Sequence, residues 1–214
     1  VAELWLANLM DTNGVIGGAD TRPSARIEPD GRTFSYVLFD PTELDLDGER
    51  LLVTQNDIRA IQLAKAALYA GIRLLMDHLE IDTVDEIGLA GAFGSHIDTI
   101  HATVLGLVPD CDPDRVTSVG NAAGAGAAIA LLSGSARRSI VEVVDRIEKI
   151  ETALEPAFQD HFVNAMAIPH RTAEYPCLST RITLPERSTA SAVGPERSGR
   201  RRRRNGATRE EDTP

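Results

Sequence analysis

The sequence predicts an α/β fold in which a mixed sheet is flanked by helices. Short apolar stretches alternate with helix-compatible segments along the chain, which is the pattern of this class. Two of the apolar stretches run into glycines and then into a helix, within residues 87–105 and 116–132. The 214 residues are 43% hydrophobic and 25% charged, which suits a globular protein with one good core.

The first half of the chain is expected to hold two paired strands and one long helix. Residues 34–40 have the β-branched and aromatic character of a strand, and residues 50–54 supply a partner. A helix then follows over residues 57–79, with Thr54 or Asn56 as its N-cap. Apolar residues recur at helical spacing along it, which indicates a central helix packed on a sheet.

The second half is expected to alternate strands with shorter helices. Residues 84–90 form a candidate buried strand, and a short helix follows at residues 99–105. Residues 116–119 form another short strand, and the small residues 121–132 form a helix. Further predicted elements are a helix over 136–147, a strand over 149–154 and a helix over 156–165.

The distribution of charge divides the chain into a body and a tail. Residues 1–178 hold 13 basic and 27 acidic side chains, and this acidic balance argues against nucleic-acid binding by the folded part. Residues 179–214 are rich in Ser, Thr, Pro, Gly and Arg, and are expected to be disordered. The run Arg200–Arg204 fits either a solvated tail, which we favour, or a contact with an anionic surface.

The two cysteines, Cys111 and Cys177, form no disulfide framework and no C-x-x-C pair. We interpret them as reduced thiols of a cytoplasmic protein. No signal peptide is visible, and the run 122–132 is far too short to span a bilayer. The chain begins with Val1 inside a predicted helix end, from which we expect a longer parent protein.

The first glycine segment, Gly91-Ala-Phe-Gly-Ser95, follows a predicted strand. Gly91 and Gly94 permit a sharp turn and allow a purine or a ribose to lie against bare main chain. Phe93 fits base stacking or the core, and Ser95 fits a helix cap or a ligand donor. A tight strand-to-helix turn without any ligand explains the same residues equally well. Neither glycine segment is a P-loop or a G-x-G-x-x-G motif.

The second segment places Gly120, Gly124 and Ala128 on one helical face at steps of four residues. This spacing permits two helices to approach closely, as at a hinge between subdomains, although simple tight packing accounts for it too. Asn121 is positioned to cap the helix and to face a cleft.

No residue set predicts a metal site. His96 and His101 are five residues apart, so they do not share a helical face, and a surface or capping role is favoured. The aspartates around Cys111 resemble the start of a calcium loop, but Pro113 and the absence of the loop glycine favour a solvated acidic turn. No G-x-S-x-G or other nucleophile–base arrangement is present.

Taken together, five ordered segments closely resemble the carboxy-terminal domain of the reductive activators of corrinoid proteins. This group lies within the ASKHA superfamily, which includes acetate and sugar kinases, Hsc70 and actin. The resemblance covers residues 1–178, and the segments that carry it are 53–73, 89–98, 106–110, 118–126 and 162–170.

The resemblance implies an ASKHA lobe and a role in an ATP-dependent metallo-activase. Such an activator reduces the Co(II) corrinoid of a methyltransferase system to Co(I) and couples this electron transfer to ATP. The corrinoid protein is the implied partner, and ATP with Mg²⁺ is the implied cofactor. Adenosine is expected to contact the residues that match the superfamily motifs, namely Gly91, Ala92, Phe93, Gly94, Ser95, Gly120, Asn121 and Gly124.

The chain departs from the complete activators in two ways. It lacks the cysteine quartet of a [2Fe-2S] domain, so that cluster is expected only in an amino-terminal domain outside this sequence. The acidic phosphate-binding hairpins are expected upstream of Val1, so this portion alone is expected to be inactive. Two alternatives stay open: a non-catalytic module of the same fold for dimerisation or protein binding, and an unrelated enzyme that uses 91–95 as a phosphate loop.

Overall fold

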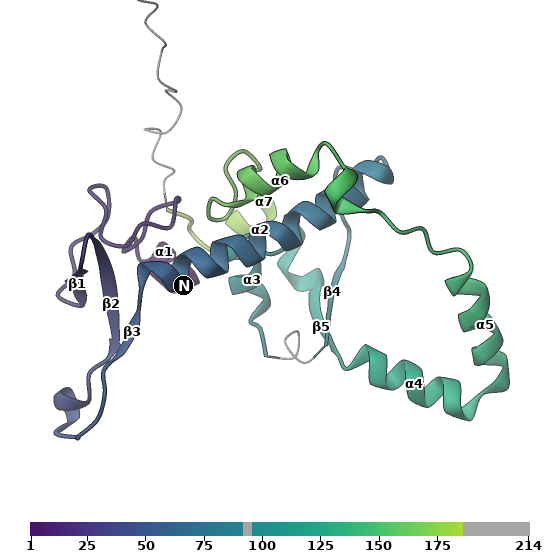
Figure 1. The fold of residues 1–214 in the computed structure, drawn as a ribbon, viewed down its shortest axis with the longest axis horizontal. Coiled ribbons are helices and arrows are strands. Elements are labelled where there is room, and N and C mark those ends of the chain that lie inside the picture. Colours follow the sequence, from purple (N-terminus) through teal and green to yellow (C-terminus); the bar gives the residue numbers. More distant parts are fainter. Residues whose placement is uncertain (92–95, 186–214) are drawn as a thin grey trace, which may run out of the picture.

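The computed structural model describes residues 1–91 and 96–185, and it has the expected α/β composition (Figure 1). The strands are β1 (Ile27–Asp30), β2 (Thr33–Phe39), β3 (Leu51–Val53), β4 (Ile87–Ala90) and β5 (Val116–Gly120). The helices are α1 (Ala2–Leu6), α2 (Gln55–His78), α3 (Thr99–Leu105), α4 (Ala122–Leu132), α5 (Gly134–Val144), α6 (Phe158–Ala165) and α7 (Pro176–Ser179).

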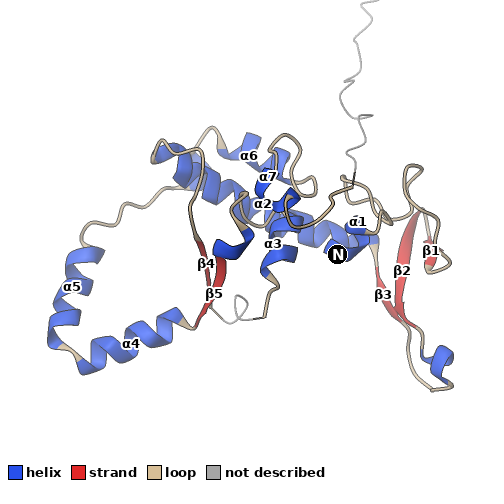
Figure 2. Cartoon of the chain, turned by 180° about the vertical axis from the view of Figure 1, so that it is seen from behind, coloured by secondary structure: helices blue, strands red, loops and turns tan. Residues whose placement is uncertain are grey.

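The described strands form two separate sheets, which lie at different places along the long helix α2 (Figures 1 and 2). Strands β1, β2 and β3 form an antiparallel meander in which Tyr36 lies opposite both Ile27 and Val53. Strands β4 and β5 form a parallel pair, with α3 in the crossover between them. The antiparallel and parallel parts of the expected mixed sheet are therefore distributed over two sheets in the described residues.

Helix α2 begins with a capping box, which confirms Thr54 rather than Asn56 as its N-cap. The Thr54 hydroxyl accepts a hydrogen bond from the Asp57 amide, and the Asp57 carboxylate accepts one from the Thr54 amide at 2.8 Å. The expected apolar stripe is only partly buried, because Leu68 and Leu75 are about half exposed. The helix packs mainly along α6 rather than on a sheet, which corrects the sequence prediction.

Three polar side chains of α2 tie distant loops to the helix. Gln55 donates to the Gly14 carbonyl at 2.6 Å, and Gln62 donates to the carbonyls of Asn13 and Met166, each at 2.9 Å. Lys65 is fully buried, and its ammonium group donates to the carbonyls of Ala167 and Pro169. Because Gln62 and Lys65 have hydrogen-bond partners, these two polar side chains can lie within the otherwise apolar buried face of α2.

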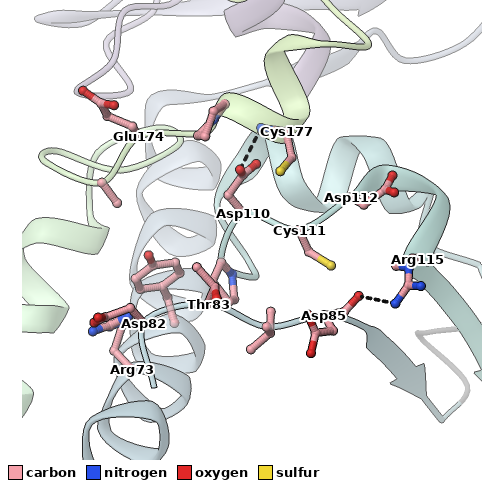
Figure 3. Close-up of a pocket in the computed structure, with 15 residues that line it drawn as sticks. Arg73, Asp82, Thr83, Asp85, Asp110, Cys111, Asp112, Arg115, Glu174 and Cys177 are labelled. Atoms are coloured by element: carbon pink, nitrogen blue, oxygen red, sulfur yellow. Dashed lines mark hydrogen bonds between the residues drawn. The ribbon is translucent and has the colours of Figure 1, made fainter. Parts of the chain in front are cut away.

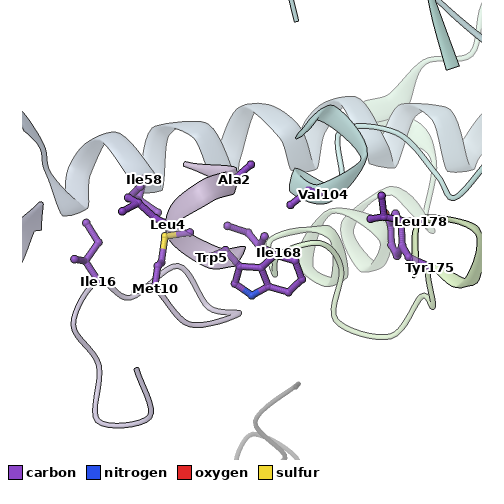
Figure 4. Close-up of a cluster of buried hydrophobic side chains, with 10 residues drawn as sticks. All are labelled: Ala2, Leu4, Trp5, Met10, Ile16, Ile58, Val104, Ile168, Tyr175 and Leu178. Atoms are coloured by element: carbon purple, nitrogen blue, oxygen red, sulfur yellow. The ribbon is translucent and has the colours of Figure 1, made fainter. Parts of the chain in front are cut away.

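The main core brings together segments from both ends of the described chain (Figure 4). Trp5 of α1 is 2% exposed and lies in one cluster with Ile58 of α2, Val104 of α3 and Leu178 of α7. Met10, Ile16 and Ile168 come from loops and are also completely buried. Since α1 and α7 share this cluster, residues near 1 and near 178 belong to one folded body.

Two boundary predictions beyond β5 need correction. Residues 149–154 contain no strand; a short 3₁₀ helix spans Thr152–Leu154 instead. Helix α5 begins at Gly134, with Ser133 as its cap, and ends at Val144, whereas the sequence predicted a helix over 136–147. Helices α4 and α5 contact each other and project away from the rest of the body in both views (Figures 1 and 2).

The carboxy-terminal part of the described chain continues past the predicted start of the tail. Helix α7 ends at Ser179, and Ile182 and Leu184 pack against the main core. The remainder of the predicted tail, residues 186–214, lies outside the described residues. Residues 179–185 are therefore attached to the folded body, and the prediction of a disordered tail now concerns residues 186–214.

Candidate functional site

The carboxyl ends of β4 and β5 lie side by side. Ala90 pairs with Gly120, and the Gly91 amide donates a hydrogen bond to the Gly120 carbonyl at 2.7 Å. The register shifts between Leu89 and Ala90, so the pairing is irregular where the strands end. The two glycine turns singled out in the sequence thus meet at one edge, as parallel pairing requires.

Both turns need glycine for conformational reasons. Gly91 has φ = 98° and Gly120 has φ = 65°, which are backbone conformations that other residues rarely adopt. A Cβ atom built on either residue would meet no atom of the described residues within 4 Å. The described part of the chain therefore leaves the main chain at both strand ends open to approach, which is the feature that a ligand lying on bare backbone requires.

Asn121 caps helix α4 as predicted, because its side-chain oxygen accepts a hydrogen bond from the Gly124 amide at 2.9 Å. The small-residue face of α4 does not receive another helix in the described structure, since Gly124 and Ala128 are exposed. A Cβ atom on Gly124 would lie 2.5 Å from the side-chain nitrogen Nδ2 of Asn121. Gly124 thus makes room for the cap, which differs from the helix crossing that the sequence suggested.

Four of the eight predicted adenosine-side residues lie outside the described part of the chain. They are Ala92, Phe93, Gly94 and Ser95, which follow Gly91 directly. The structure brings the described ones, Gly91, Gly120, Asn121 and Gly124, to the same strand edge. Their assignment to adenosine stays a prediction.

A cavity of about 590 Å³ lies at the opposite end of the same strands (Figure 3). It is formed by the segments that precede β4 and β5, by one turn of α2, and by the start of α7. Five carboxyl groups and two guanidinium groups line it, which are those of Asp82, Asp85, Asp110, Asp112, Glu174, Arg73 and Arg115. This excess of negative charge does not suit the phosphates of a nucleotide.

Some charged groups of this cavity, Asp110 and Arg115 among them, have structural partners. Both oxygens of Asp110 accept hydrogen bonds from α7, from the Cys177 amide at 2.8 Å and the Leu178 amide at 3.0 Å. Arg115 donates to the Asp85 carbonyl at 3.5 Å (Figure 3). The predicted solvated acidic turn is therefore wrong for Asp110, which is half-buried and anchors α7.

The two cysteines adjoin the same cavity and are both free thiols. Burial raises the pKa of Cys111, and a hydrogen bond to the Asp110 carboxylate is the main cause that raises the pKa of Cys177. A raised pKa keeps a thiol protonated at neutral pH, whereas an iron–sulfur cluster needs four cysteine thiolates. The residues present do not fit a [2Fe-2S] cluster.

Two of the histidines make contacts within the local structure. Asp98 caps α3 through the His101 amide at 2.8 Å, and His101 contacts the Glu3 carboxylate at 2.6 Å. His161 lies 2.7 Å from Asp77 of α2. Among the described residues, no group of three or more His, Cys, Asp or Glu side chains is arranged to hold a metal ion.

The sequence analysis did not single out Lys65, although a fully buried lysine is unusual in proteins. Burial lowers the pKa of its ammonium group to about 7. The available signal is its helical spacing, because Lys65 lies four residues before Tyr69 and seven after Ile58 on the buried face. The cavity residues give no such signal, since they come from loops far apart in sequence.

Comparisons with known proteins agree with the resemblance inferred from the motifs. The family model described as "C-terminal domain of RACo the ASKHA domain" matches residues 1–179. The "Corrinoid activation enzyme RamQ" of Eubacterium limosum is 41% identical over 124 residues, covering 56% of this chain. A solved "Reductive activator for corrinoid,iron-sulfur protein" matches 79% of this chain with a TM-score of 0.67 and 31% identity.

The chain spans only about a quarter of these relatives. The match covers 21% of RamQ and 27% of the solved activator chain. Activities and partners of the complete relatives therefore depend on much that lies beyond the matched segment. Within the described residues, no helix combines the length and apolarity needed to cross a bilayer.

Proposed function

We propose, because the chain belongs to the family of the C-terminal ASKHA domain of RACo, that it forms the adenosine side of an ATP cleft. The complete protein would be an ATP-dependent activator that reduces a Co(II) corrinoid to Co(I). The similar proteins named for corrinoid activation support this assignment. A corrinoid protein of a methyltransferase system is the proposed partner, and the cytoplasm is the proposed compartment.

One observation supports the nucleotide role above the others: the bond between the Gly91 amide and the Gly120 carbonyl, 2.7 Å long. It places two positive-φ turns at the carboxyl edge of a parallel pair, where α/β proteins bind ligands. Because no described residue would meet a Cβ atom on either glycine, a sugar or a base could contact the main chain directly there. Asn121, exposed beside them, offers an amide for a further hydrogen bond.

In this proposal the chain supplies the adenosine side only. Phosphate and Mg²⁺ binding would come from the other lobe of the activator, and electron transfer from its iron–sulfur domain. A micromolar nucleotide affinity requires about 8 kcal/mol, and charge stabilisation of the phosphates supplies much of that. We therefore expect this chain alone to bind ATP weakly and to be inactive as an enzyme.

Calorimetry with ATP tests this proposal on two proteins. The first is this chain, and the second is a chimera in which residues 1–179 replace the matching segment of RamQ. We expect much tighter binding by the chimera, and competition by adenosine rather than by pyrophosphate alone. Absence of ATP binding by both proteins would refute the nucleotide role, and competition by pyrophosphate only would indicate a phosphate loop instead.

A matched pair of glycine variants tests whether ATP binds at the carboxyl edge of β4 and β5. Gly91→Val in the chimera is expected to weaken ATP binding at least about tenfold, because valine is strained at this φ and its side chain fills the open space. Gly31→Val is the control, since Gly31 has φ = 62° and open surroundings on the turn between β1 and β2. Equal affinities for the two variants would contradict the assignment.

A second candidate is a non-catalytic module of the same fold for dimerisation or protein binding. The exposed apolar side chains of α4 and α5 favour it, since such surfaces mark interaction sites. This candidate predicts a chimera that folds without binding ATP. The calorimetric experiment therefore separates the two functions.

A further inference from the structure

The α4–α5 hairpin, residues 122–144, has no buried residue in either helix, although much of it is apolar. Helix α4 contains only Ala, Gly, Ile and Leu. Leu131 and Leu132 are 79% and 85% exposed. A helix that is apolar on all sides belongs in an interior, because water would otherwise face apolar side chains around its whole circumference.

Helix α5 has a different character. Its apolar side chains are Ile140, Val141, Val143 and Val144, and all four are exposed by two fifths or more. Arg137, Arg138 and Glu142 occupy other positions of the same helix. This composition is that of an outer helix with one face toward a core and one toward water, so α4 is the inner and α5 the outer element.

The hairpin is held in shape by its own polar contacts. The Ser133 hydroxyl caps α5 by accepting from the Ala136 amide at 3.2 Å. Arg137 reaches back across the connection and donates to the Ala130 carbonyl at 2.7 Å. The apolar surface is therefore presented by a defined pair of helices rather than by an unstructured segment.

The hairpin starts directly at the parallel strand pair. Asn121 joins β5 to α4, and Val119 of β5 is also about half exposed. Strands β4 and β5 are both edge strands, because their sheet has two strands in the described residues. Parallel sheets are normally covered on both faces, so the exposed surface of the hairpin continues onto this sheet.

We propose that another lobe of the same activator polypeptide covers this surface, with α4 inserted between that lobe and α5. The relatives have the necessary chain, since more than two thirds of the length of RamQ and of the solved activator lies outside the match. A second copy of this chain fits less well, because a two-fold contact covers one side of a helix and α4 is apolar on every side. The inference does not require bound nucleotide.

Hydrogen–deuterium exchange of the nucleotide-free proteins tests the proposal. Amides of residues 122–144 are compared in this chain and in the chimera that carries residues 1–179 within RamQ. We expect exchange in the chimera to be slower by about tenfold or more, because a covered helix opens less often. Equal exchange in the two proteins would overturn the proposal, whether or not the chimera binds ATP.

Variants identify the surface that is covered. The double substitution L131D/L132D is expected to return the exchange of 122–144 in the chimera to the rate of the isolated chain. Leu44→Asp is the matched control, because Leu44 is 62% exposed beside the other sheet, and it should leave the exchange unchanged. Unchanged exchange of α2 amides shows that each variant is folded, and continued protection of the hairpin in L131D/L132D would contradict the proposal.

Two further outcomes would show that something other than a lobe of the activator covers the α4–α5 surface. Slower exchange in the isolated chain as its concentration rises would identify a second copy as the cover. Slower exchange of the isolated chain only on addition of phospholipid vesicles would identify a membrane surface. Either result would overturn the assignment to another lobe of the activator.

Discussion

Replacing Lys65 with Met is expected to change the pH dependence of stability. In the folded protein burial lowers the pKa of the Lys65 ammonium to about 7, whereas in the unfolded chain it takes the ordinary value of 10.5. Between these two values the unfolded state binds more protons than the folded state. The stability contributed by Lys65 is therefore complete above pH 10.5 and decreases as the pH falls to about 7.

The magnitude follows from the same two pKa values. One proton of difference between the states changes the free energy of unfolding by about 1.4 kcal/mol per pH unit. The stability of the wild type relative to Lys65→Met should therefore grow by about 3 kcal/mol between pH 7.5 and pH 9.5. At the higher pH the variant is less stable, because Ala167 and Pro169 lose the donor to their carbonyls.

Urea unfolding followed by tryptophan fluorescence measures this effect. Trp5 is the only tryptophan in the sequence and is 2% exposed in the core, so its emission reports on unfolding. Lys149→Met is the control, because the Lys149 side chain is 79% exposed and should show no such pH dependence. A difference between wild type and Lys65→Met that stays constant from pH 7.5 to 9.5 would refute the lowered pKa.

Three further substitutions test the packing and the caps. Gly106→Ala should destabilise the protein by several kcal/mol in urea, because its Cβ would lie 1.9 Å from the Pro169 carbonyl oxygen at a φ of 71°. Asp110→Asn should lower the pKa of the Cys177 thiol, so that alkylation by iodoacetamide becomes faster at pH 8. Thr54→Ala should cost about 1 kcal/mol in thermal or urea unfolding through loss of the capping box.

Each of these has a control that separates it from a general loss of structure. Gly31→Ala has a similar positive φ but open surroundings, so a loss as large as that of Gly106→Ala would exclude the clash as the cause. The alkylation is followed in a Cys111→Ser background, and an unchanged or slower rate would contradict the role of the carboxylate. Thr54→Ser keeps the hydroxyl and should restore most of the lost stability, and failure to do so would argue against the cap.

The sequence was informative wherever one local pattern determined the geometry. A short apolar stretch followed by glycine predicted both β4 and β5, and parallel pairing then had to place Gly91 beside Gly120. Asn121 before a run of small residues correctly predicted a helix cap. These features depend on a few consecutive residues, so no distant segment was needed to predict them.

The sequence was less informative where distant segments decide burial. Leu68 and Leu75 look like core residues of α2 but are about half exposed. Gln62 and Lys65 are buried instead, because carbonyls of the loop 166–169 accept their hydrogen bonds. Residues 149–154 were predicted as a strand, but Thr152–Leu154 form a 3₁₀ helix and no described strand pairs with them. Neither outcome is visible in a local window, because the partners lie elsewhere in the chain.

The contacts of α2 also limit how early the protein can fold during its synthesis. The acceptors of Lys65 lie 102 and 104 residues further along, so the helix is synthesised long before they exist. At about 5–20 residues per second, a ribosome takes at least several seconds to add that stretch. During this interval the ammonium group has only water as its partner, and closing the interior around it would be costly. Closing the body around Lys65 therefore awaits synthesis of nearly the whole matched segment.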